Sequence, residues 1–362
     1  MKKIIISVTN DLTTDQRVAK VCNTLLANNF EITLIGRKLK NSLPINRNYQ
    51  TKRMQLFFNK GFLFYAEYNF RLFFVLLFAK KSILLANDLD TLLPNFLVSK
   101  IKKTPIIYDS HELFPEIPEL VHKKNVKKIW SKLEATILPK LTNCYTVCNS
   151  IAKYYAEKYN TQFKVIKNLP LKNKAITTGK LGFKTENKKV ILYQGSVNVG
   201  RGLELIIDTI TYLPNHILVI VGTGNIINNL KQLVLVKKLQ NQIYFLGRKT
   251  PEELQKITPL ADLGISIEED LGLNYRFALP NKIFDYIQAT IPILVSNLPE
   301  MKQIVLEHKV GEIIAERNPK ALANQINNMA NKDFSVALKK AKEHLIWEKQ
   351  EDELLTIFKS LM

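Results

Sequence analysis

Residues 268–292 read EEDLGLNYRFALPNKIFDYIQATIP and decide the fold of the second half of the chain. They follow a short apolar strand predicted at 263–267 and pass through a polar loop into a helix that begins at Pro-Asn-Lys. Ligands of open α/β sheets bind beyond the carboxyl ends of the strands, where this loop lies. Asn281 and Lys282 present free amide groups at the helix N-terminus, which favours phosphate. Asp285, one turn on, is placed to accept hydrogen bonds from sugar hydroxyls, so the stretch indicates a nucleotide.

The same alternation of strands and helices extends on both sides of this stretch. Continuous apolar runs, typical of strands buried on both faces, occur at 190–193, 217–221, 243–246, 263–267 and 293–296. Helices are predicted at 202–212, 225–239, 251–261, 281–289, 299–308, 321–331 and 334–362. The second half of the chain is therefore predicted to be a doubly wound α/β domain.

The first half shows the same architecture. Strands are predicted at 2–8, 31–36, 82–86, 105–108, 144–148 and 164–166, and helices at 15–28, 61–79 and 121–141, while the basic, polar segment 37–60 has no predicted element. Because 362 residues exceed one ordinary core, we expect two domains. The turn-rich segment 169–188 is the predicted linker between a domain at 1–168 and a domain at 189–340, and a C-terminal helix is expected at 341–362.

The net charge of +20 belongs mostly to the first half. Residues 1–168 hold 27 Lys and Arg against 12 Asp and Glu, whereas residues 169–362 hold 25 against 20. This asymmetry indicates an anionic partner, either a membrane surface, a nucleic acid or a polyanionic acceptor, unless the lysines only keep the chain soluble.

Three cysteines are too few for a disulfide framework, and the chain opens directly into a strand without a signal peptide, so a reduced, cytoplasmic compartment is expected.

Two segments raise the question of a membrane. The aromatic tract 61–79 is interrupted by Glu67 and Arg71, and its longest apolar run is far short of the ~20 residues of a spanning helix, so we predict a buried helix rather than one that dips into a bilayer. The helix at 121–141 carries Trp130 beside a basic face. That face contains Lys123, Lys124, Lys127, Lys128 and Lys132. Such a helix either lies on anionic lipid or has an ordinary solvated face.

Two polar clusters follow neighbouring strands of the first half, Asn-Asp-Leu-Asp at 87–90 and Asp-Ser-His-Glu at 109–112. They are expected to face one cleft, where His111 contacts a ligand rather than serving a structural role. Asp109 either orients the His111 ring or caps the next turn, and Arg17 adds a charge to the cleft. Asp88 and Asp90 offer too few oxygen ligands for a hard cation, so no metal is predicted.

The loop 194–202, QGSVNVGRG, connects a strand to a helix. Its glycines, Gly195 and Gly200 among them, let amide groups approach a phosphate, and Arg201 supplies a bidentate donor, although a plain tight turn has the same composition. The loop has neither the Gly-Lys-Ser/Thr end of a P-loop nor GxGxxG. Gly222, in the turn GTG after the next strand, is a weaker phosphate candidate because such loops also need glycine for geometry.

Together these motifs resemble the retaining glycosyltransferases of family 4, which have the GT-B fold. The resemblance rests on two Rossmann-like domains and on the segments QGSVNVGRG, VGTGN, FLGRKTPEEL, ADLGIS and LNYRFALPNKIFDYIQATIPILVSNLPE. The segments NDLTTDQRV, ANDLDTLLP and YDSHELFPE are similar to a bacterial branch of the family. The resemblance implies two doubly wound domains facing a cleft, with C-terminal helices that cross back to the first domain.

The resemblance also implies roles for individual residues. Arg201 and Lys282 would hold the donor pyrophosphate without an obligatory metal or other cofactor, Asp285 would bind the ribose, and His111 would contact the transferred sugar. Further donor-binding candidates are Gly195, Ser196, Gly200, Gly222, Glu268, Asn274 and Asn281, and acceptor-side candidates are Arg17, Asp88 and Asp109.

The sequence departs from the family pattern at two positions. Phe277 stands where the family has an acid that touches the donor sugar, and Ser196 stands where many members have a second arginine. Sugar recognition is therefore expected from the preceding loop, through Glu268, Glu269, Asp270 or Asn274.

The predicted function is transfer of a sugar from a nucleoside diphosphate to an acceptor hydroxyl with retention, in the synthesis of cell-surface polysaccharide or glycolipid. The partners implied are the donor, a glycan or lipid-linked acceptor and, peripherally, the anionic inner face of the plasma membrane. A nucleotide-sugar epimerase of the same fold is the alternative. A basic nucleic-acid-binding protein would also explain the charge, but no recognition module is visible.

Overall fold

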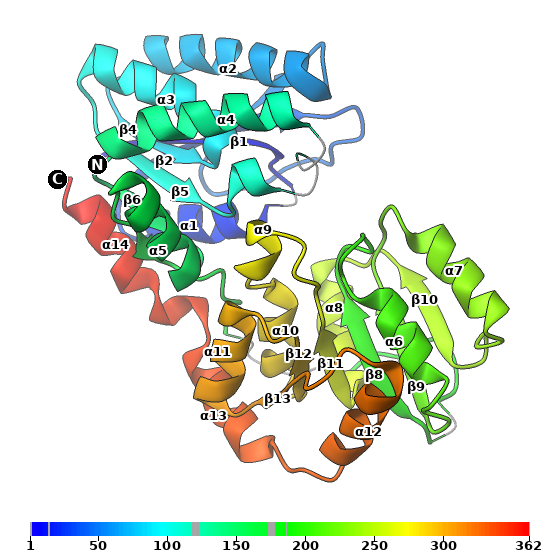
Figure 1. Ribbon diagram of the computed structural model, residues 1–362. Helices are drawn as coiled ribbons and strands as arrows, with labels where there is room; N and C mark the ends of the chain where they lie inside the picture. Colours follow the sequence, from blue (N-terminus) through cyan, green and yellow to red (C-terminus); the bar gives the residue numbers. More distant parts are fainter. Residues whose placement is uncertain are drawn as a thin grey trace. The chain divides into compact units, whose positions relative to one another are not determined.

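The computed structural model describes residues 2–13, 15–117, 120, 123–172, 178–185 and 187–361. The chain divides into two compact units (Figure 1). The N-terminal unit comprises Met1–Asn168 together with Gln350–Met362, and the C-terminal unit comprises Leu169–Lys349. Residue 169, the predicted start of the linker, is the first residue of the second unit. Residues 173–177 and 186 of the predicted linker lie outside the described residues.

The N-terminal unit is built on a seven-stranded parallel sheet in the order β3-β2-β1-β4-β5-β6-β7. The strands are β1 (Lys3–Asp11), β2 (Glu31–Lys38), β3 (Gln50–Gln55), β4 (Ile83–Asn87), β5 (Ile106–Ser110), β6 (Cys144–Thr146) and β7 (Lys164–Val165). The β-branched run of β1 lies in the middle of the sheet and is covered on both faces, as its composition predicts.

Strand β3 is not predicted from the sequence. It reads QTKRMQ, and only Met54 of its side chains is buried. The strand lies at the edge of the sheet, so it pairs with β2 alone and presents polar side chains to solvent. An edge strand of this kind has no apolar run, which is why the segment 37–60 reads as a polar connection.

Helices cover the sheet of the N-terminal unit. They are α1 (Gln16–Ala27), α2 (Gly61–Phe78), α3 (Leu89–Lys102), α4 (Lys124–Ile137), α5 (Asn149–Tyr159) and α14 (Glu351–Lys359). Two residues of the helix predicted at 121–141, Val121 and His122, lie outside the described residues. The expected terminal helix is broken after α13 (Ser335–His344), and only α14 joins the N-terminal unit. There the Thr24 hydroxyl donates to Glu351 at 2.6 Å, so the chain does return to its first unit.

Helix α2 differs from its prediction as a buried helix. Its buried side chains form a single stripe, Phe64, Tyr68, Leu72 and Leu76, which packs against β1, β2 and β4. Only 22% of its residues are buried. Within the described part of the chain it is also the one helix long and apolar enough, at a mean hydropathy of 1.3, to cross a membrane by length and composition.

The C-terminal unit is built on a six-stranded parallel sheet in the order β10-β9-β8-β11-β12-β13. The strands are β8 (Lys189–Gln194), β9 (His216–Val221), β10 (Ile243–Gly247), β11 (Leu263–Ser266), β12 (Ile293–Val295) and β13 (Gly311–Ile313). The helices are α6 (Leu203–Ile210), α7 (Ile227–Val236), α8 (Pro251–Ile257), α9 (Leu273–Arg276), α10 (Asn281–Gln288), α11 (Pro299–His308), α12 (Pro319–Met329) and α13. The edge strand β13 and the short helix α9 are not among the predicted elements.

Successive residues of each strand in this sheet enter different cores. Ile191 and Tyr193 of β8 pack under α6, α7 and α12, whereas Val190 and Leu192 face α10, α11 and α13. Tyr286 of α10 fixes that helix to the sheet, since its hydroxyl donates toward the carbonyl of Leu192 at 3.1 Å. The unit is thus a sheet covered on both faces, with α10 held directly behind the carboxyl ends of β8 and β11.

Candidate functional site

In the C-terminal unit the loop after β8 runs directly against Lys282. Gly195 has a φ of +137°, and a Cβ there would lie 3.4 Å from Cε of Lys282. Gly222 has a φ of +145°, and a Cβ on it would come within 1.8 Å of the Gly195 carbonyl oxygen. Glycine at these two positions lets the two loops and the lysine share one small space. The predicted loops around Gly195 and Gly222 are therefore neighbours in the fold.

Lys282 and Arg201 converge on one carboxylate at the end of β11. The Lys282 ammonium lies 2.7 Å from Oε1 of Glu268, and the Arg201 guanidinium lies 3.7 Å from the same oxygen. The hydroxyl of Ser266 donates to the other oxygen, Oε2, at 2.8 Å. Lys282 and Glu268 are buried, whereas the Arg201 side chain keeps 25% of its surface exposed. We call Arg201, Glu268 and Lys282 the C-terminal cluster.

The C-terminal cluster carries more positive than negative charge. Burial alone would raise the pKa of Glu268, but the Lys282 ammonium, the Arg201 guanidinium and the Ser266 hydrogen bond together bring that pKa below its ordinary value. Glu268 is therefore ionised at neutral pH, and one carboxylate faces two cations. The surplus positive charge is available for an anion such as a diphosphate.

Two tyrosines position the cations of this cluster. The Lys282 ammonium lies 4.2 Å from the centre of the Tyr193 ring, and the Arg201 guanidinium lies 5.1 Å from that of Tyr275. The hydroxyl of Tyr193 donates to the Ser196 carbonyl at 2.6 Å. Sequence reasoning missed both tyrosines, since tyrosine in a strand or short helix reads as a core residue. A cation-rich loop beside a tyrosine is the only sequence signal they give.

Asp285 lies at the same edge of the sheet. Its carboxylate accepts a hydrogen bond at 2.9 Å from the side-chain amide of Gln194, whose carbonyl oxygen in turn accepts one from Thr258 at 2.8 Å. Gln194 is the last residue of β8, directly before the glycine loop, and that position could have indicated its role. Asn281 is exposed at the first turn of α10. Asp285 is half-buried, and the amide of Gln194 that orients its carboxylate is itself fixed by Thr258.

The structure changes the role expected for Glu268. We predicted a contact with the donor sugar, but the side chain is fully buried and both carboxylate oxygens are occupied by Lys282, Arg201 and Ser266. Glu268 is instead the internal counter-ion that holds the two cations in position. Of its loop neighbours, Asp270 pairs with Arg276 at 2.9 Å, while Asn274 is half-buried in α9.

Arg317 is a further cation near this edge that the sequence did not single out. Its guanidinium donates to the Ile267 carbonyl at 3.1 Å and to the Ser296 hydroxyl at 3.1 Å, and it lies 3.9 Å from Glu269. It thereby ties the loop after β11 to the end of β12. Phe277, at the position of the expected acid, is the half-buried C-terminal cap of α9.

In the N-terminal unit the two predicted polar clusters meet. The Arg17 guanidinium donates to both oxygens of Asp109, at 2.9 and 3.0 Å, and to the Ile166 carbonyl at 2.9 Å. His111 lies between two acids, with Nε2 at 3.0 Å from Asp109 and Nδ1 at 3.1 Å from Asp88. The backbone amide of His111 also donates to Asp88 at 2.8 Å. We call Arg17, Asp88, Asp109 and His111 the N-terminal cluster.

These contacts fix the charges of the N-terminal cluster. Burial would lower the pKa of His111, but Asp88 and Asp109 outweigh it and raise that pKa well above its ordinary value, so the ring is an imidazolium. Burial would raise the pKa of Asp109, but Arg17 and His111 bring it down to about 2. Arg17 and Asp109 are buried beneath the His111 ring, which is itself partly exposed. We expected Arg17 and Asp109 to contact an acceptor, but in the fold they support the His111 ring instead.

Asp88 and Asp90 behave differently although they are two residues apart. Asp88 has a φ of +58° and turns its carboxylate toward His111. Asp90 is buried and accepts a hydrogen bond from Thr9 at 2.5 Å, and burial, with the nearby charge of Asp88, raises its pKa to about 8. Asp90 is therefore mostly protonated at neutral pH. Among the residues that the structure describes, no group of three His, Cys, Asp or Glu is arranged to hold a metal ion.

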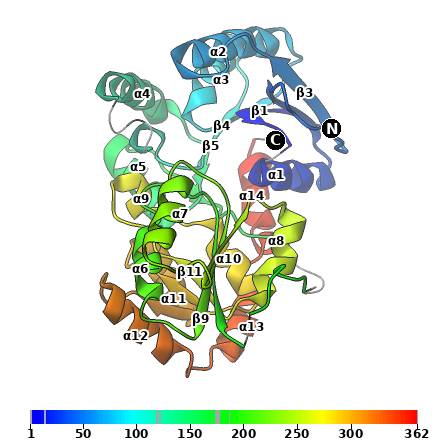
Figure 2. The ribbon, with the colours of Figure 1, turned by 90° about the vertical axis from the view of Figure 1, so that its right-hand side faces the viewer.

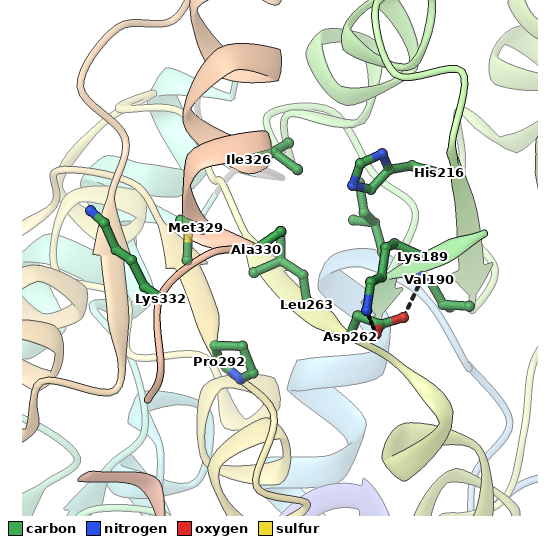
Figure 3. Close-up of a pocket in the computed structure, with 11 residues that line it drawn as sticks. Lys189, Val190, His216, Asp262, Leu263, Pro292, Ile326, Met329, Ala330 and Lys332 are labelled. Carbon is green, nitrogen blue, oxygen red and sulfur yellow. Dashed lines mark hydrogen bonds and ion pairs between the residues drawn. The ribbon is translucent and has the colours of Figure 1, made fainter. Parts of the chain in front are cut away.

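A separate cavity of about 160 Å³ opens at the other edge of the C-terminal sheet, between the amino ends of the strands and the end of α12 (Figure 3). Lys189 and Asp262 form an ion pair across its polar side at 3.1 Å, and Ile326 and Met329 line its apolar side. The cavity lies away from every predicted site residue. It is therefore not the candidate site.

Comparison with known proteins finds similarity to glycosyltransferases. Residues 180–346 match the family described as glycosyl transferases group 1. An uncharacterized glycosyltransferase of Methanocaldococcus jannaschii is 22% identical over 188 residues, which cover 49% of this chain and 46% of that protein. The matched part thus spans about half the length of this curated relative.

Three solved structures are similar over nearly the whole chain. Sucrose-phosphate synthase from Thermosynechococcus elongatus has a TM-score of 0.83 at 13% identity, covering 100% of this chain and 99% of that one. Anabaena HepE in complex with UDP-glucose has a TM-score of 0.74 at 15% identity, covering 99% and 100%. WaaG, a glycosyltransferase involved in lipopolysaccharide biosynthesis, has a TM-score of 0.66 at 12% identity, covering 97% and 99%. The chain therefore has the GT-B fold, and its residues 180–346 are similar to the family described as glycosyl transferases group 1.

Proposed function

We propose that the protein is a glycosyltransferase that moves a sugar from a nucleoside diphosphate to an acceptor hydroxyl with retention, as the resemblance to the bacterial branch of family 4 implies. The observation that carries the proposal is the C-terminal cluster, in which two cations face one carboxylate at the carboxyl end of β11. The group 1 domain and the similarity to a protein solved with UDP-glucose support the same reading.

In the proposed reaction negative charge grows on the departing diphosphate. Arg201, partly exposed, and Lys282, beside the Gly195 loop, are the groups that would stabilise that charge. The free amides at the start of α10 add a further partial positive charge. We propose that these groups suffice without an obligatory metal ion.

In this proposal Asp285 and His111 contact the other parts of the donor, the ribose and the sugar. Asp285 binds the ribose hydroxyls, and its hydrogen bond from Gln194 fixes the orientation of its carboxylate. His111 contacts the transferred sugar as an imidazolium, a hydrogen-bond donor oriented by Asp88 and Asp109. The buried acids Glu268 and Asp109 already hold cations, so they are not placed as the covalent nucleophile of a double displacement. Attack on the donor from the face that the diphosphate leaves accounts for retention.

The proposed acceptor is a glycan or a lipid-linked glycan of the cell surface, reached from the cytoplasmic side of the membrane. The excess positive charge of residues 1–168 supports an anionic or membrane-proximal acceptor. WaaG, with a similar fold, is described as taking part in lipopolysaccharide biosynthesis.

A charge-matched pair of variants tests the proposal. Arg201→Ala removes one positive charge from the C-terminal cluster, and Lys189→Ala removes one from the opposite end of β8. Thermal-shift titrations with UDP-, GDP- and ADP-glucose identify the donor, and release of free nucleoside diphosphate with an acceptor extract measures turnover. Arg201→Ala should weaken donor binding at least tenfold and lower turnover by about 10²- to 10³-fold, whereas Lys189→Ala should change neither.

Two results would overturn the proposal. The first is equal turnover in Arg201→Ala and Lys189→Ala, because the diphosphate would then not bind at the C-terminal cluster. The second is conversion of the donor sugar into an isomer with no acceptor present, which marks an epimerase of the same fold.

A further inference from the structure

Helix α2 exposes the side opposite its buried stripe, and that side is aromatic. Tyr68 and Leu72 are buried against the sheet, whereas Phe70, Phe74 and Phe78 are 66%, 39% and 80% exposed. The spacing of four residues places these three phenylalanines on one side of the helix. Their rings contact one another, with centroids 5.0 Å apart for Phe70 and Phe74 and 6.2 Å apart for Phe74 and Phe78.

The loop before α2 and the first turn of the helix expose further phenylalanines. Phe57 and Phe62 are 84% and 73% exposed, and Phe58 is also exposed. The loop is held in place, because the Glu67 carboxylate accepts hydrogen bonds at 2.9–3.0 Å from the backbone amides of Phe57 and Phe58. The Arg71 guanidinium pairs with Glu67 at 2.7 Å and lies over the Phe57 ring. We call Phe57, Phe58, Phe62, Phe70, Phe74 and Phe78 the phenylalanine face.

Positive charge borders the phenylalanine face at both ends of the helix. Lys60 is exposed directly before α2, and Lys80 and Lys81 are exposed directly after it. Between residues 51 and 103 nine Lys and Arg stand against three acids, Glu67, Asp88 and Asp90, each of which accepts hydrogen bonds. An apolar surface with a basic rim complements an anionic lipid bilayer.

Helix α2 cannot leave its unit to span a bilayer. Its buried stripe forms part of a core of the N-terminal unit, and the Tyr68 hydroxyl donates to the Val8 carbonyl of β1. The ammonium group of Lys102 on α3 donates to the last carbonyls of α2, Leu77 at 3.1 Å and Ala79. Both views show α2 beside α3 (Figures 1 and 2). The helix is therefore fixed on the unit with its aromatic side outward.

Helix α4, which the sequence suggested for lipid contact, offers charge but no aromatic anchor. The Trp130 ring packs against those of Phe114 and Tyr65, with centroids 4.9 and 5.2 Å away. The exposed side of α4 carries lysines, among them Lys124, Lys128 and Lys132. Val126 and Ile129 of α4 are also exposed, at 38% and 58%, but the exposed phenylalanines lie on α2 and the loop before it.

We propose that the phenylalanine face docks the N-terminal unit on an anionic lipid bilayer, with α2 lying in the plane of the interface and its rings inserted below the headgroups. The lysines at the ends of α2 contact the lipid phosphates. A second copy of this chain is a poorer occupant, because two copies of this face would bring the Lys60, Lys80 and Lys81 rims against like charges. The proposal is independent of the glycosyl transfer proposed above.

The test is co-sedimentation of the full chain with vesicles of phosphatidylcholine alone and with 30% phosphatidylglycerol, a composition of about one third anionic lipid. Phe70→Ser/Phe78→Ser removes two exposed rings of α2, and Val236→Ser/Val336→Ser removes two similarly exposed apolar side chains from the C-terminal unit. We expect the phenylalanine variant to lose about 100-fold in partitioning to anionic vesicles, and the valine variant to bind like the parent. Lys80→Gln/Lys81→Gln should lose about fivefold per charge on anionic vesicles only.

Circular dichroism and thermal melting of all three variants serve as the check on folding, so that this control does not depend on the proposed function. Unchanged vesicle binding by Phe70→Ser/Phe78→Ser would overturn the proposal. So would a parent protein that binds neither vesicle but forms a dimer in light scattering that the phenylalanine variant dissociates, because the occupant would then be a second copy.

Discussion

The N-terminal and C-terminal clusters use the same groups in different proportions. In the N-terminal cluster two cations, Arg17 and His111, face two carboxylates, so the charges balance. In the C-terminal cluster Glu268 alone faces two cations. Each cluster lies at the carboxyl ends of parallel strands, so the difference arises from side chains and not from the fold.

The difference in net charge between the two clusters indicates what each of them can bind. A balanced and buried cluster is satisfied by itself, and it holds its exposed member, His111, in one orientation. A cluster with surplus positive charge and a partly exposed arginine can bind an anion, because its charge is not fully compensated within the protein. We infer that the C-terminal cluster binds the diphosphate and that the N-terminal cluster presents a preorganised donor group.

Removing Lys282 should have the largest effect of any single change, because it removes both the surplus positive charge and the ammonium group that lies 2.7 Å from Glu268. Lys282→Ala leaves a buried carboxylate with one cation at 3.7 Å. We expect turnover to fall by about 10²- to 10³-fold and the C-terminal unit to lose about 3–5 kcal/mol of unfolding free energy. Hydrogen exchange at the amides of β11, compared with those of β5, measures the second effect.

The double variant Lys282→Met/Glu268→Gln separates these two effects. It removes the pair together, so most of the stability should return while turnover stays low. Recovery of turnover along with stability would mean that Lys282 acts only on the fold. In that case the surplus positive charge of the C-terminal cluster would not be needed to bind the diphosphate.

Asp109→Asn should have the next largest effect, and it should act on the other unit. The change leaves the buried Arg17 with a neutral partner and removes one of the two carboxylates beside His111. We expect the N-terminal unit to lose about 3 kcal/mol of unfolding free energy at neutral pH, seen as faster exchange at β5 with β11 unchanged. Faster exchange at β11 instead would show that the cluster does not stabilise its own unit.

The pH dependence of this loss follows from the pKa of Asp109. That pKa is about 2 in the folded chain, below the ordinary value near 4, so the carboxylate stabilises the fold above that ordinary value and loses this effect as pH falls toward 2. The gap between the parent and Asp109→Asn should therefore close on acidification. A gap that is constant from pH 7 to pH 2.5 would contradict the assigned charge.

Much of this fold follows from local sequence signals. Apolar runs mark β1, β4, β8, β9 and β11, and Pro280 before Asn281 marks the start of α10 within a residue. Polar residues at strand ends correctly bring Asp88, Asp109 and His111 together, since the ends of neighbouring parallel strands must meet. The edge strand β3 was missed because an edge needs no apolar run.

The roles of individual side chains were harder to predict, because they depend on contacts that are distant in sequence. Arg17 reads locally as a neighbour of Asp15, yet its partner Asp109 lies 92 positions away. The sequence suggests that Glu268 is an exposed acid in a loop. In the fold it is buried and forms ion pairs with Lys282 and Arg201. The aromatic tract of α2 correctly predicted a helix, but the prediction that the helix is buried was wrong. Its composition is apolar on every side, while only one side contacts the sheet.

Asp90→Asn should have the smallest effect near pH 5, and it tests whether the balance of the N-terminal cluster is counted correctly. The folded chain holds the Asp90 proton up to a pKa of about 8, whereas the unfolded chain releases it near pH 4. Raising the pH through this window therefore favours unfolding of the parent, and asparagine, which cannot ionise, removes that dependence. The variant should be more stable than the parent by about 1.5 kcal/mol at pH 5, where the unfolded chain has already released the proton, and by more than that at pH 8.

Urea unfolding at both pH values, with exchange at β5 and β11 to assign the unit, measures this difference. The C-terminal unit serves as the internal control, because Asp90 lies wholly within the N-terminal unit. If the difference does not grow between pH 5 and pH 8, Asp90 is ionised in the folded chain. The N-terminal cluster would then carry three carboxylates against two cations, opposite in sign to the C-terminal cluster, and it would repel an anionic acceptor instead of presenting a neutral surface to it.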